Sequence, residues 1–405
     1  MMTILFWTAI LLVSYVYLGY PLLLRALTAL VGGKEVARGE IEPRVTLMIS
    51  AYNEERVIGE KLRNSLALDY PKEKLEILVV SDCSTDRTDE IVREFSSQGV
   101  VLNRMETRRG KTWGLNESVP RSSGEILLFS DANALYRPDA VQKLVRNFHD
   151  PEVGCVTGES QYIDTDRSSV GWQEDCYWNY ERLLKIDETW RGSMVGSDGA
   201  IFAIRRGLYE PLRESDINDF VVPLQIVKKG FRCVYEPEAV CKERGTVRYE
   251  EEFRRKVRVV NRSVYALRKM KGLLNPFRFG WFSFQLLSHK VLRWCMPIWL
   301  GVLLLSNLAL SGRGGFYRLS LYAQGFFYLL ALAGGGLSTF RIKGIRIITI
   351  PYYFCMVNTA ALYGIIKGLM GRVQVTWNPE REAAPADGGD GGVPAARRGA
   401  LRQNR

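Results

Sequence analysis

Short apolar runs alternate with amphipathic stretches in the first third of the chain. The apolar runs cover residues 45–50, 77–81 and 126–130, and the stretches with helical spacing follow near 54–68, 88–95 and 138–148. This alternation is typical of βαβ units, in which helices join buried strands of one parallel sheet. The pattern therefore predicts an α/β domain.

Long apolar stretches occupy both ends of the chain. Arg25 is the only charge between residues 3 and 31, and three further stretches cover 291–310, 316–337 and 345–366. About 20 residues at ~1.5 Å each cross a hydrocarbon core of ~30 Å, so each stretch is a predicted membrane span. Because no basic segment precedes the first stretch, a span is favoured over a cleaved signal peptide.

Charges beside these stretches predict the orientation. Lys34, Arg38 and Arg44 follow the first span, which by the positive-inside rule places the N-terminus outside and the residues from 34 onward in the cytoplasm. A full crossing of 345–366, which we expect, would place the tail outside. Pro351 and several polar residues leave a re-entrant or interfacial segment as the alternative. Beyond Pro379 the composition predicts a disordered tail.

The formal charge of +11 on 405 residues bears on which classes of binding partner we expect. The basic residues gather between 244 and 271 and beside apolar segments, where anionic lipid head groups and phosphorylated small molecules suffice as ligands, so we expect no nucleic acid partner. Seven cysteines without a C-x-x-C pair, and two histidines, argue against a zinc site and a disulfide framework.

Polar residues follow each of the three predicted strands. Tyr52, Asn53 and Glu54 follow the first, Asp82 follows the second, and the third ends in Asp131-Ala132-Asn133. Open α/β sheets bind ligands beyond the carboxyl ends of their strands, so these side chains predict one nucleotide site. The oxygens of Asp131 and Asn133 suit Mg²⁺ or Mn²⁺ bridging a diphosphate, although turn formation alone explains such residues equally simply.

Two further positions carry candidate chemistry. Lys111 follows Gly110 but lacks the upstream glycine of a P-loop, since Met105 stands there; it still provides a point charge for a phosphate or a solvated surface charge. Asp219 lies near the start of a predicted helix, whose dipole keeps a carboxylate ionised. With so few histidines, Asp219 is the candidate general base, and helix capping is its alternative role.

Residues 250–267 predict an amphipathic helix with one apolar face. That face contains Phe253, Val257, Val260, Val264 and Leu267, and arginines including Arg258 and Arg262 occupy the others. This pattern is typical of a helix that lies on an anionic membrane surface. One of its arginines could also pair with a diphosphate.

In order and spacing, the motifs over residues 45–267 resemble a membrane-embedded family 2 glycosyltransferase, the class of cellulose, hyaluronan and poly-N-acetylglucosamine synthases. The motifs are Tyr52-Asn53-Glu54, Ser81-Asp82, Gly110-Lys111, Asp131-Ala132-Asn133, Gly199–Arg206 and Asn218-Asp219. The resemblance implies a GT-A fold with a Rossmann-like mixed sheet and added transmembrane helices. It also implies that Asp82 contacts the nucleobase, that Asp131 holds the diphosphate through the metal, and that Asp219 is the base.

The resemblance adds two more elements of the site. Gly196, Ser197, Asp198 and Gly199 resemble the loop that shapes the acceptor pocket, and Arg258 is the arginine of a Q-x-x-R-W motif. Arg255 replaces the glutamine of that motif, and Val259 replaces the tryptophan that would stack on an acceptor sugar, which weakens the case for a long processive polymer.

We therefore expect a multi-pass inner-membrane enzyme that transfers a sugar from a nucleotide sugar to a growing glycan. The donor is expected to be a UDP-sugar, and the transfer is expected to invert the anomeric carbon. Its regions would be a span (1–33), a cytoplasmic GT-A domain (34–248), interfacial helices (249–290), three spans (291–370) and a tail (371–405). Single-sugar transfer to polyprenyl phosphate or another lipid is the alternative, and a transporter or scaffold that only binds nucleotide is a further rival. A polysaccharide product would add an export partner to the donor, the acceptor and the bilayer.

Overall fold

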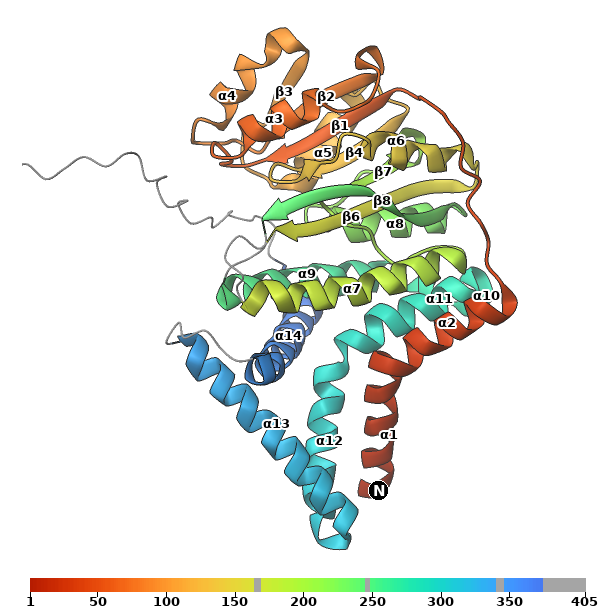
Figure 1. Ribbon diagram of the computed structural model, residues 1–405, viewed down its shortest axis with the longest axis vertical. Coiled ribbons are helices and arrows are strands. Elements are labelled where there is room, and N and C mark those ends of the chain that lie inside the picture. Colours follow the sequence, from red (N-terminus) through yellow and green to blue (C-terminus); the bar gives the residue numbers. More distant parts are fainter. Residues whose placement is uncertain (164–168, 245–247, 340–345, 374–405) are drawn as a thin grey trace, which may run out of the picture.

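The computed structural model describes residues 1–163, 169–244, 248–339 and 346–373. At its centre lies an eight-stranded sheet in the order β3-β2-β1-β4-β7-β6-β8-β5 (Figure 1). The strands are β1 (Val45–Ala51), β2 (Leu75–Ser81), β3 (Val100–Arg104), β4 (Ile126–Asp131), β5 (Leu135–Tyr136), β6 (Val153–Ile163), β7 (Phe202–Arg205) and β8 (Arg232–Arg244). The predicted tail lies outside the described residues from 374 onward.

The first half of the sheet is parallel, and its strands end in register. β1 pairs with β2 and β4, so that Ala51 lies opposite Ser81 and Ser50 opposite Asp131. The helices α3 (Ile58–Leu66), α4 (Thr88–Glu94) and α5 (Lys111–Ser118) connect the strands from β1 to β4, and α6 (Ala140–Val145) follows β5. The predicted alternation of strands and helices is confirmed, and it brings the polar strand ends to one edge.

The second half of the sheet is mixed. β7 runs antiparallel to both β4 and β6, β6 pairs parallel with β8, and the short β5 lies antiparallel to β8. Both faces are covered: alternate residues of β1 pack with α3, α4 and α6 on one side, whereas Met48 packs with α5 and α8 (Asn218–Lys228) on the other. The predicted α/β class with a mixed sheet is thus confirmed.

A layer of helices separates the sheet from the terminal helices. α7 (Ser169–Trp190) and α9 (Tyr249–Lys269) both lie beneath the sheet, and α14 (Arg346–Leu369) lies under them (Figure 1). The apolar face of α9 is covered by α14: Phe253 packs with Tyr353 and Met356, and Val260 packs with Ala361. The face that we predicted to lie on a membrane is therefore occupied by the protein itself.

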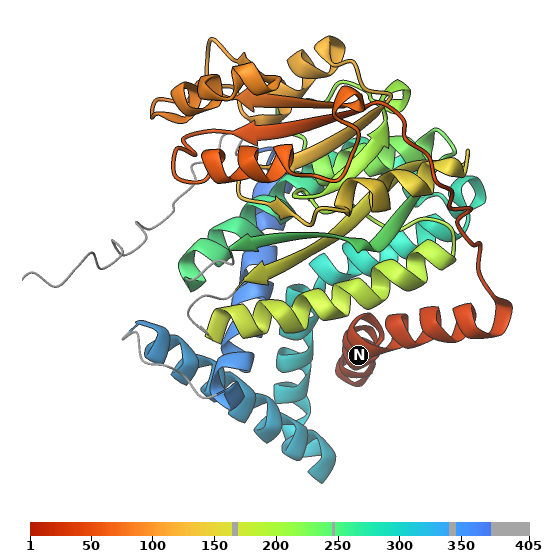
Figure 2. The same cartoon turned by 45° about the horizontal axis from the view of Figure 1, so that its top comes forward.

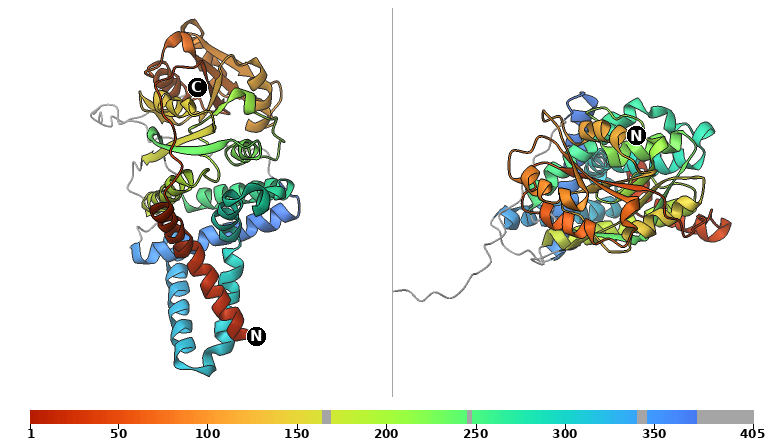
Figure 3. Two further views of the ribbon diagram at one scale, coloured as in Figure 1. Left: turned by 90° about the vertical axis from the view of Figure 1, so that its right-hand side faces the viewer. Right: turned by 90° about the horizontal axis from the view of Figure 1, so that it is seen from above.

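The remaining helices extend away from the domain, with α1, α12 and α13 projecting together (Figure 3). They are α1 (Met2–Ser14), α2 (Tyr20–Val31), α10 (Pro276–Phe279), α11 (Trp281–Gln285), α12 (Met296–Leu310) and α13 (Gly315–Thr339). A π-helical turn, η1 (Tyr15–Gly19), separates α1 from α2, and η8 (Leu286–Leu292) separates α11 from α12. At each turn the chain changes direction, and residues 32–44 then follow the side of the domain to β1 (Figures 1 and 2).

Two of the helices that the structure describes are long and apolar enough to cross a membrane, and this holds by length and composition alone. They are Met2–Val31 and Met296–Arg313. The other two predicted spans form the helices α13 and α14 but do not meet this criterion. Moreover, α14 runs across the direction of α12 and α13 (Figure 3). The prediction of three C-terminal spans is therefore not supported as a whole.

Candidate active site

The residues after β1 join that strand end to the next one. Asn53, at a left-handed φ of 53°, accepts the Thr85 N–H at 2.8 Å, and the N–H of the buried Glu54 donates to Thr88 Oγ1 at 2.7 Å. The Arg108 guanidinium lies 3.8 Å from the centre of the Tyr52 ring. Of the three predicted donor residues here, Tyr52 faces the segment before α5, whereas these contacts of Asn53 and Glu54 fix the loop after β2.

Asp82 fixes the segment that leads into α5. Its carboxylate accepts the N–H groups of Arg109 and Gly110, each at 2.9 Å. Gly110 has a φ of +93°, a conformation that favours glycine. Burial raises the pKa of Asp82, against the effect of these two hydrogen bonds. Asp82 therefore sets the position of Lys111, the first residue of α5.

Lys111 and Asp131 meet at the strand-end edge. The Nζ of Lys111 lies 2.6 Å from Asp131 Oδ1, and 28% of the lysine side chain and 41% of the aspartate side chain are exposed. Asn133 follows in the turn after β4. The ammonium and the carboxylate are thus both accessible to a diphosphate and its cation.

The donor set suits a hard cation only in part. Within the described ranges, no group of three or more His, Cys, Asp or Glu side chains could hold a metal ion. Asp131 supplies a charged oxygen and Asn133 a neutral one, which are ligands that Mg²⁺ and Mn²⁺ accept. These two residues fit a cation whose remaining ligands come from the donor phosphates and water.

Asp219 lies in the first turn of α8, as predicted, with the four-residue loop of residues 196–199 against it. The Ser197 N–H and hydroxyl both donate to the Asp219 carbonyl, at 2.8 and 2.7 Å. A Cβ at Gly199 would lie 3.1 Å from Asp219 Oδ2, so a larger residue there would crowd the carboxylate. Asp198 of this loop is itself buried, and its N–H donates to Thr157 Oγ1 at 2.9 Å. The structure therefore brings the candidate acceptor loop and the candidate base together.

The carboxylate of Asp219 has the properties of a base. Although the residue is partly exposed, its Oδ1 is shut off from solvent and has no hydrogen-bond partner among the described residues. Burial raises the pKa of Asp219 to about 6, with Asp198 and Asp131 adding to the rise and Lys111 opposing it. A carboxyl with this pKa ionises just below neutral pH and accepts a proton more readily than an ordinary aspartate.

Two arginines of α9 face the catalytic domain. Burial and the charges of Arg262 and Arg255 lower the pKa of Arg258 to about 10, and attraction to Asp219 and Asp131 opposes this shift. Arg262 donates to the carbonyls of Ser215, at 3.1 Å, and Glu214, at 3.2 Å. Arg258 was predicted to be a donor-binding residue, whereas Arg262 was expected on an exposed helix face and was not among the predicted site residues. Its only signal was its position one turn after Arg258.

Two buried ionisable residues were missed by the sequence prediction. Lys61 on α3 has no exposed surface; its Nζ donates to the Ala134 carbonyl and lies 3.9 Å from the centre of the Tyr136 ring, and burial lowers its pKa to about 7. At the end of β8, burial raises the pKa of Glu243 to about 8, helped by Asp131 and Asp198. Neither residue has a local sequence signal, because only the folded sheet brings it near Asp131.

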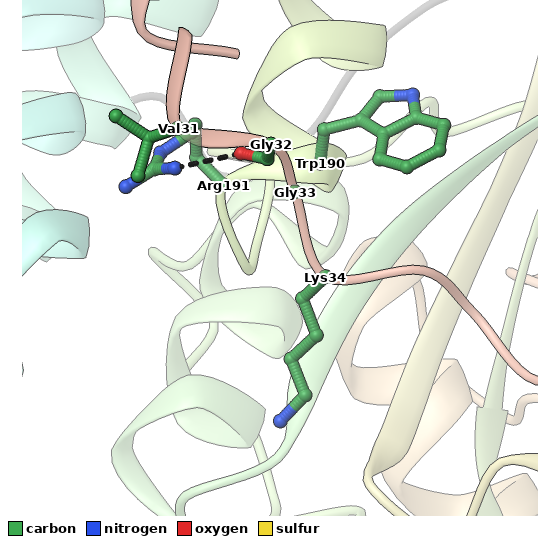
Figure 4. Close-up of a pocket in the computed structure, with 6 residues that line it drawn as sticks. All are labelled: Val31, Gly32, Gly33, Lys34, Trp190 and Arg191. Carbon is green, nitrogen blue, oxygen red and sulfur yellow. Dashed lines mark hydrogen bonds between the residues drawn. The ribbon is translucent and has the colours of Figure 1, made fainter.

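A surface pocket of about 370 Å³ lies elsewhere, at the end of α2. Its lining consists of Val31, Gly32, Gly33, Lys34, Trp190 and Arg191 (Figure 4). The Arg191 guanidinium donates to the Gly32 carbonyl at 3.0 Å, and the Lys34 N–H donates to the Trp190 carbonyl at 2.8 Å. These contacts attach the N-terminal segment to α7, and the pocket includes none of the candidate site residues.

Comparisons with known proteins agree with this geometry. Residues 46–213 match the family described as Glycosyl transferase family 2. "Probable glycosyltransferase YdaM" of Bacillus subtilis (strain 168) is 28% identical over 242 residues, which are 56% of this chain and 57% of that protein. "Poly-beta-1,6-N-acetyl-D-glucosamine synthase" of Staphylococcus aureus (strain COL) is 27% identical over 203 residues, 49% of each chain. The chain spans about half the length of these curated relatives.

Among solved structures, a mannosyltransferase from Pyrobaculum calidifontis in complex with GDP-Man and Mn²⁺ superimposes with a TM-score of 0.69. It is 24% identical, over 91% of this chain and 99% of that one, so the two share the fold. The mixed sheet and the matched segment are those of a GT-A-like fold. Residues 46–213 therefore form a domain that is similar to family 2 glycosyltransferases, and the relatives that it matches are named as a glycosyltransferase and a glycan synthase.

Proposed function

We propose that this chain transfers a sugar from a nucleotide-activated donor to an acceptor hydroxyl at a membrane, with inversion at the anomeric carbon. The observation that carries the proposal is the Asp219 carboxylate. Its Oδ1 has no hydrogen-bond partner among the described residues, its pKa is raised to about 6, and it lies against Gly199 of the candidate acceptor loop. A proton acceptor in this place could remove the proton from the acceptor hydroxyl and so activate it for attack.

The reaction follows from the charges around that carboxylate. Asp219 takes the proton of the acceptor hydroxyl, whose oxygen forms a bond to the anomeric carbon as the bond to the donor diphosphate breaks. Lys111, which pairs with Asp131, and Arg258, which is attracted to Asp219 and Asp131, would offset the negative charge that develops on the leaving diphosphate. A divalent cation held by Asp131 and Asn133 would supply further charge stabilisation to the same oxygens. One such displacement inverts the anomeric configuration.

We assign the donor side to the strand-end residues. Asp82 would contact the nucleobase, in keeping with its place beside Arg109 and Gly110, and Tyr52 and Lys111 would border the diphosphate. We expect a UDP-sugar. GDP-mannose is the second candidate, because the mannosyltransferase of the same fold is in complex with GDP-Man and Mn²⁺. Mn²⁺ or Mg²⁺ would be the cation.

The acceptor is proposed to be a growing glycan, and the related poly-beta-1,6-N-acetyl-D-glucosamine synthase supports this. Single transfer to a lipid-linked acceptor remains the alternative. Val259 favours it, because valine cannot stack on an acceptor sugar as a tryptophan would.

The membrane location is supported by exposed apolar side chains on the projecting helices. On α1, Ile4 and Leu11 are 71% and 67% exposed, and Leu305 on α12 and Leu319 on α13 are 68% and 69% exposed. Clusters of exposed leucines on a soluble surface would be an aggregation hazard, whereas lipid covers them without cost. We place α1, α12 and α13 in the inner membrane and the GT-A domain on its cytoplasmic side.

One experiment tests the reaction and the choice of acceptor. Purified protein in nanodiscs is incubated with Mn²⁺ and a panel of UDP-sugars and GDP-mannose, with and without membrane lipid extract, and nucleotide release and product size are measured. Nucleotide release with one donor and a polymeric product supports the proposal, and a single glycolipid product supports the alternative. Donor binding without turnover under every condition would contradict both.

A further inference from the structure

Two bends in the membrane-side helices lie against each other. They are the π-helical turns η1 and η8, and the Tyr15 hydroxyl in the first lies 2.8 Å from Ser288 Oγ in the second. π-helical turns are rare and are found frequently at functional sites. Here they occur where α1 and α12 leave the catalytic domain (Figure 1).

A single carboxylate on α7 connects both bends with the catalytic domain. Glu188 has no exposed surface. Its Oε1 accepts the Tyr20 hydroxyl at 2.8 Å and lies 2.7 Å from His289 Nδ1, while its Oε2 accepts the Val195 N–H at 3.0 Å. Glu188 therefore contacts the start of α2, the turn η8 and the segment that precedes the candidate acceptor loop.

The charges around Glu188 are paired. His289 Nε2 lies 3.1 Å from Glu181, and Lys290 and Arg293 also pair with Glu181. Although burial acts in the opposite direction, Lys290 and Arg293, with a hydrogen bond to His289, hold the pKa of Glu181 well below its usual range. Buried charges persist only when they are paired and hydrogen-bonded, because removing an ion from water is costly. The cluster is thus a fixed arrangement, and the reaction proposed above does not use it.

The contact at Val195 leads directly to the base. The next residue, Gly196, has a φ of +84°, and Ser197 then binds the Asp219 carbonyl through its N–H and its hydroxyl. Gly199 ends the loop beside Asp219 Oδ2. A displacement of Val195 is therefore transmitted over two residues to the backbone of Asp219.

We propose that Glu188 is a positioning residue, which holds the loop of residues 195–199, and through it Asp219, in a place set by the two membrane-side bends. The proposal rests on the proposed function, in which Asp219 is the base. In the part of the chain that the structure describes, Asp82, Lys111 and Asp131 make none of these contacts. Loss of the Glu188 contacts should consequently lower kcat and leave donor affinity unchanged, because a misplaced base slows the chemical step only.

The test compares variants of Glu188 in the full chain in nanodiscs. Glu188→Met removes every acceptor oxygen, and we expect kcat to fall about tenfold or more, since ~1 Å of misplacement can cost ~100-fold. Glu188→Gln keeps one oxygen for the Val195 N–H and should restore kcat to within about threefold of wild type, on the scale of a neutral hydrogen bond. Tyr20→Phe removes a single hydroxyl at the bend and should lower kcat by less than Glu188→Met.

Asp187→Asn is the matched control, because Asp187 is adjacent on α7 and also binds the N-terminal segment, through Arg25 at 3.0 Å, but makes no side-chain contact with the loop in the described structure. We expect its kcat to match wild type. If Glu188→Met lowers kcat no more than Asp187→Asn does, or lowers donor affinity in proportion, the positioning role is overturned.

Hydrogen–deuterium exchange at residues 195–199 gives a readout that needs no turnover. Exchange should be faster than wild type in Glu188→Met and in Tyr20→Phe, and unchanged in Asp187→Asn. Should Glu188→Met fail to fold, unchanged exchange in Tyr20→Phe would still refute the proposal. Absence of transfer by wild type with every donor would instead refute the proposed function. The exchange data would then still show whether Glu188 holds the loop of residues 195–199.

Discussion

In the proposed reaction, Asp219 is the residue on which turnover depends most. Replacing it by asparagine keeps the size of the side chain and its contact with Gly199 but removes the proton acceptor. We expect donor affinity to stay near wild type and turnover to fall roughly 100-fold or more, the usual effect of losing a general base. Nucleotide-release rates and donor titration measure the two quantities. Glu210→Gln, a partly exposed carboxylate paired with Lys229, is the control, and near-normal turnover in Asp219→Asn would refute the assignment.

The raised pKa of Asp219 also predicts a pH dependence. Since the base must be ionised and its pKa is about 6, kcat should rise with pH and reach half its maximum near pH 6. A pH profile at saturating donor measures this. A profile that is flat between pH 5 and 8 would show that another group accepts the proton.

The same shift has a consequence for stability. A carboxyl whose folded pKa lies above its unfolded value binds the proton more tightly when folded, so its ionisation destabilises the fold as the pH rises from about 4 to about 6. Asp219→Asn removes this cost and should raise the free energy of unfolding at pH 7.5 by on the order of 1 kcal/mol. At pH 4 the two proteins should be equally stable. Thermal unfolding at both pH values measures the difference, and a destabilised variant at pH 7.5 would contradict the predicted sign.

Asp131 and Asp82 should respond differently to metal. Asp131→Ala removes the charged ligand beside Lys111, and we expect a weaker Mn²⁺ response together with weaker donor binding. Asp82→Ala frees the Arg109 and Gly110 N–H groups and should weaken nucleotide binding with little change in the Mn²⁺ titration. Identical metal titrations for the two variants would refute this division of roles.

At the scale of elements, the packing of α14 on α9 sets the place of Arg258. A Cβ at Gly364 would lie 2.9 Å from both the Val257 carbonyl and Val260 Cβ, which lie one residue before and two residues after Arg258. Gly364→Val should therefore force the helices apart, at a cost of about 1–3 kcal/mol, and should also reduce turnover. Gly336→Val on α13, where nothing lies within 4 Å, is the control. Melting temperatures and nucleotide release measure both effects, and equal behaviour of the two variants would contradict the prediction.

The sequence predicted the places in the fold of those candidate residues that lie directly at the ends of strands or at the start of a helix. Asp82 and Asp131 follow apolar runs, and Asp219 precedes one, so a local pattern was enough. Lys61, Glu243 and the pairing of Glu188 with His289 could not be predicted, since residues 101 positions apart meet only in the folded chain. The amphipathic pattern of 250–267 gave the helix correctly but not its surroundings, because covalent neighbours do not reveal whether lipid or α14 covers an apolar face.

For the whole molecule, the arrangement of the terminal helices bears on the side of the tail. Sequence alone led us to expect a full crossing by 345–366, but α14 lies along α9 and not along α12 and α13 (Figures 1 and 3). Its C-terminal end is bound there: Arg268 donates to the Leu369 carbonyl at 2.7 Å, and Asn261 Nδ2 donates to the Arg372 carbonyl at 3.0 Å. Because Arg262 of α9 donates to the Ser215 carbonyl of the catalytic domain at 3.1 Å, this end belongs to the side of that domain. The structure thus favours the interfacial alternative.

A topology measurement decides between the two arrangements. We expect a cysteine at Met370, which is 65% exposed, in a background without other reactive thiols, to react with an impermeant maleimide only after cells are lysed. A second cysteine at Gly312, in the turn between α12 and α13, should react in intact cells, because two crossings by these helices place that turn outside. Labelling of Met370→Cys in intact cells would show instead that α14 crosses the membrane. Its contacts with α9 would then have to be absent in the cell, and Gly364→Val would lose its expected effect on turnover.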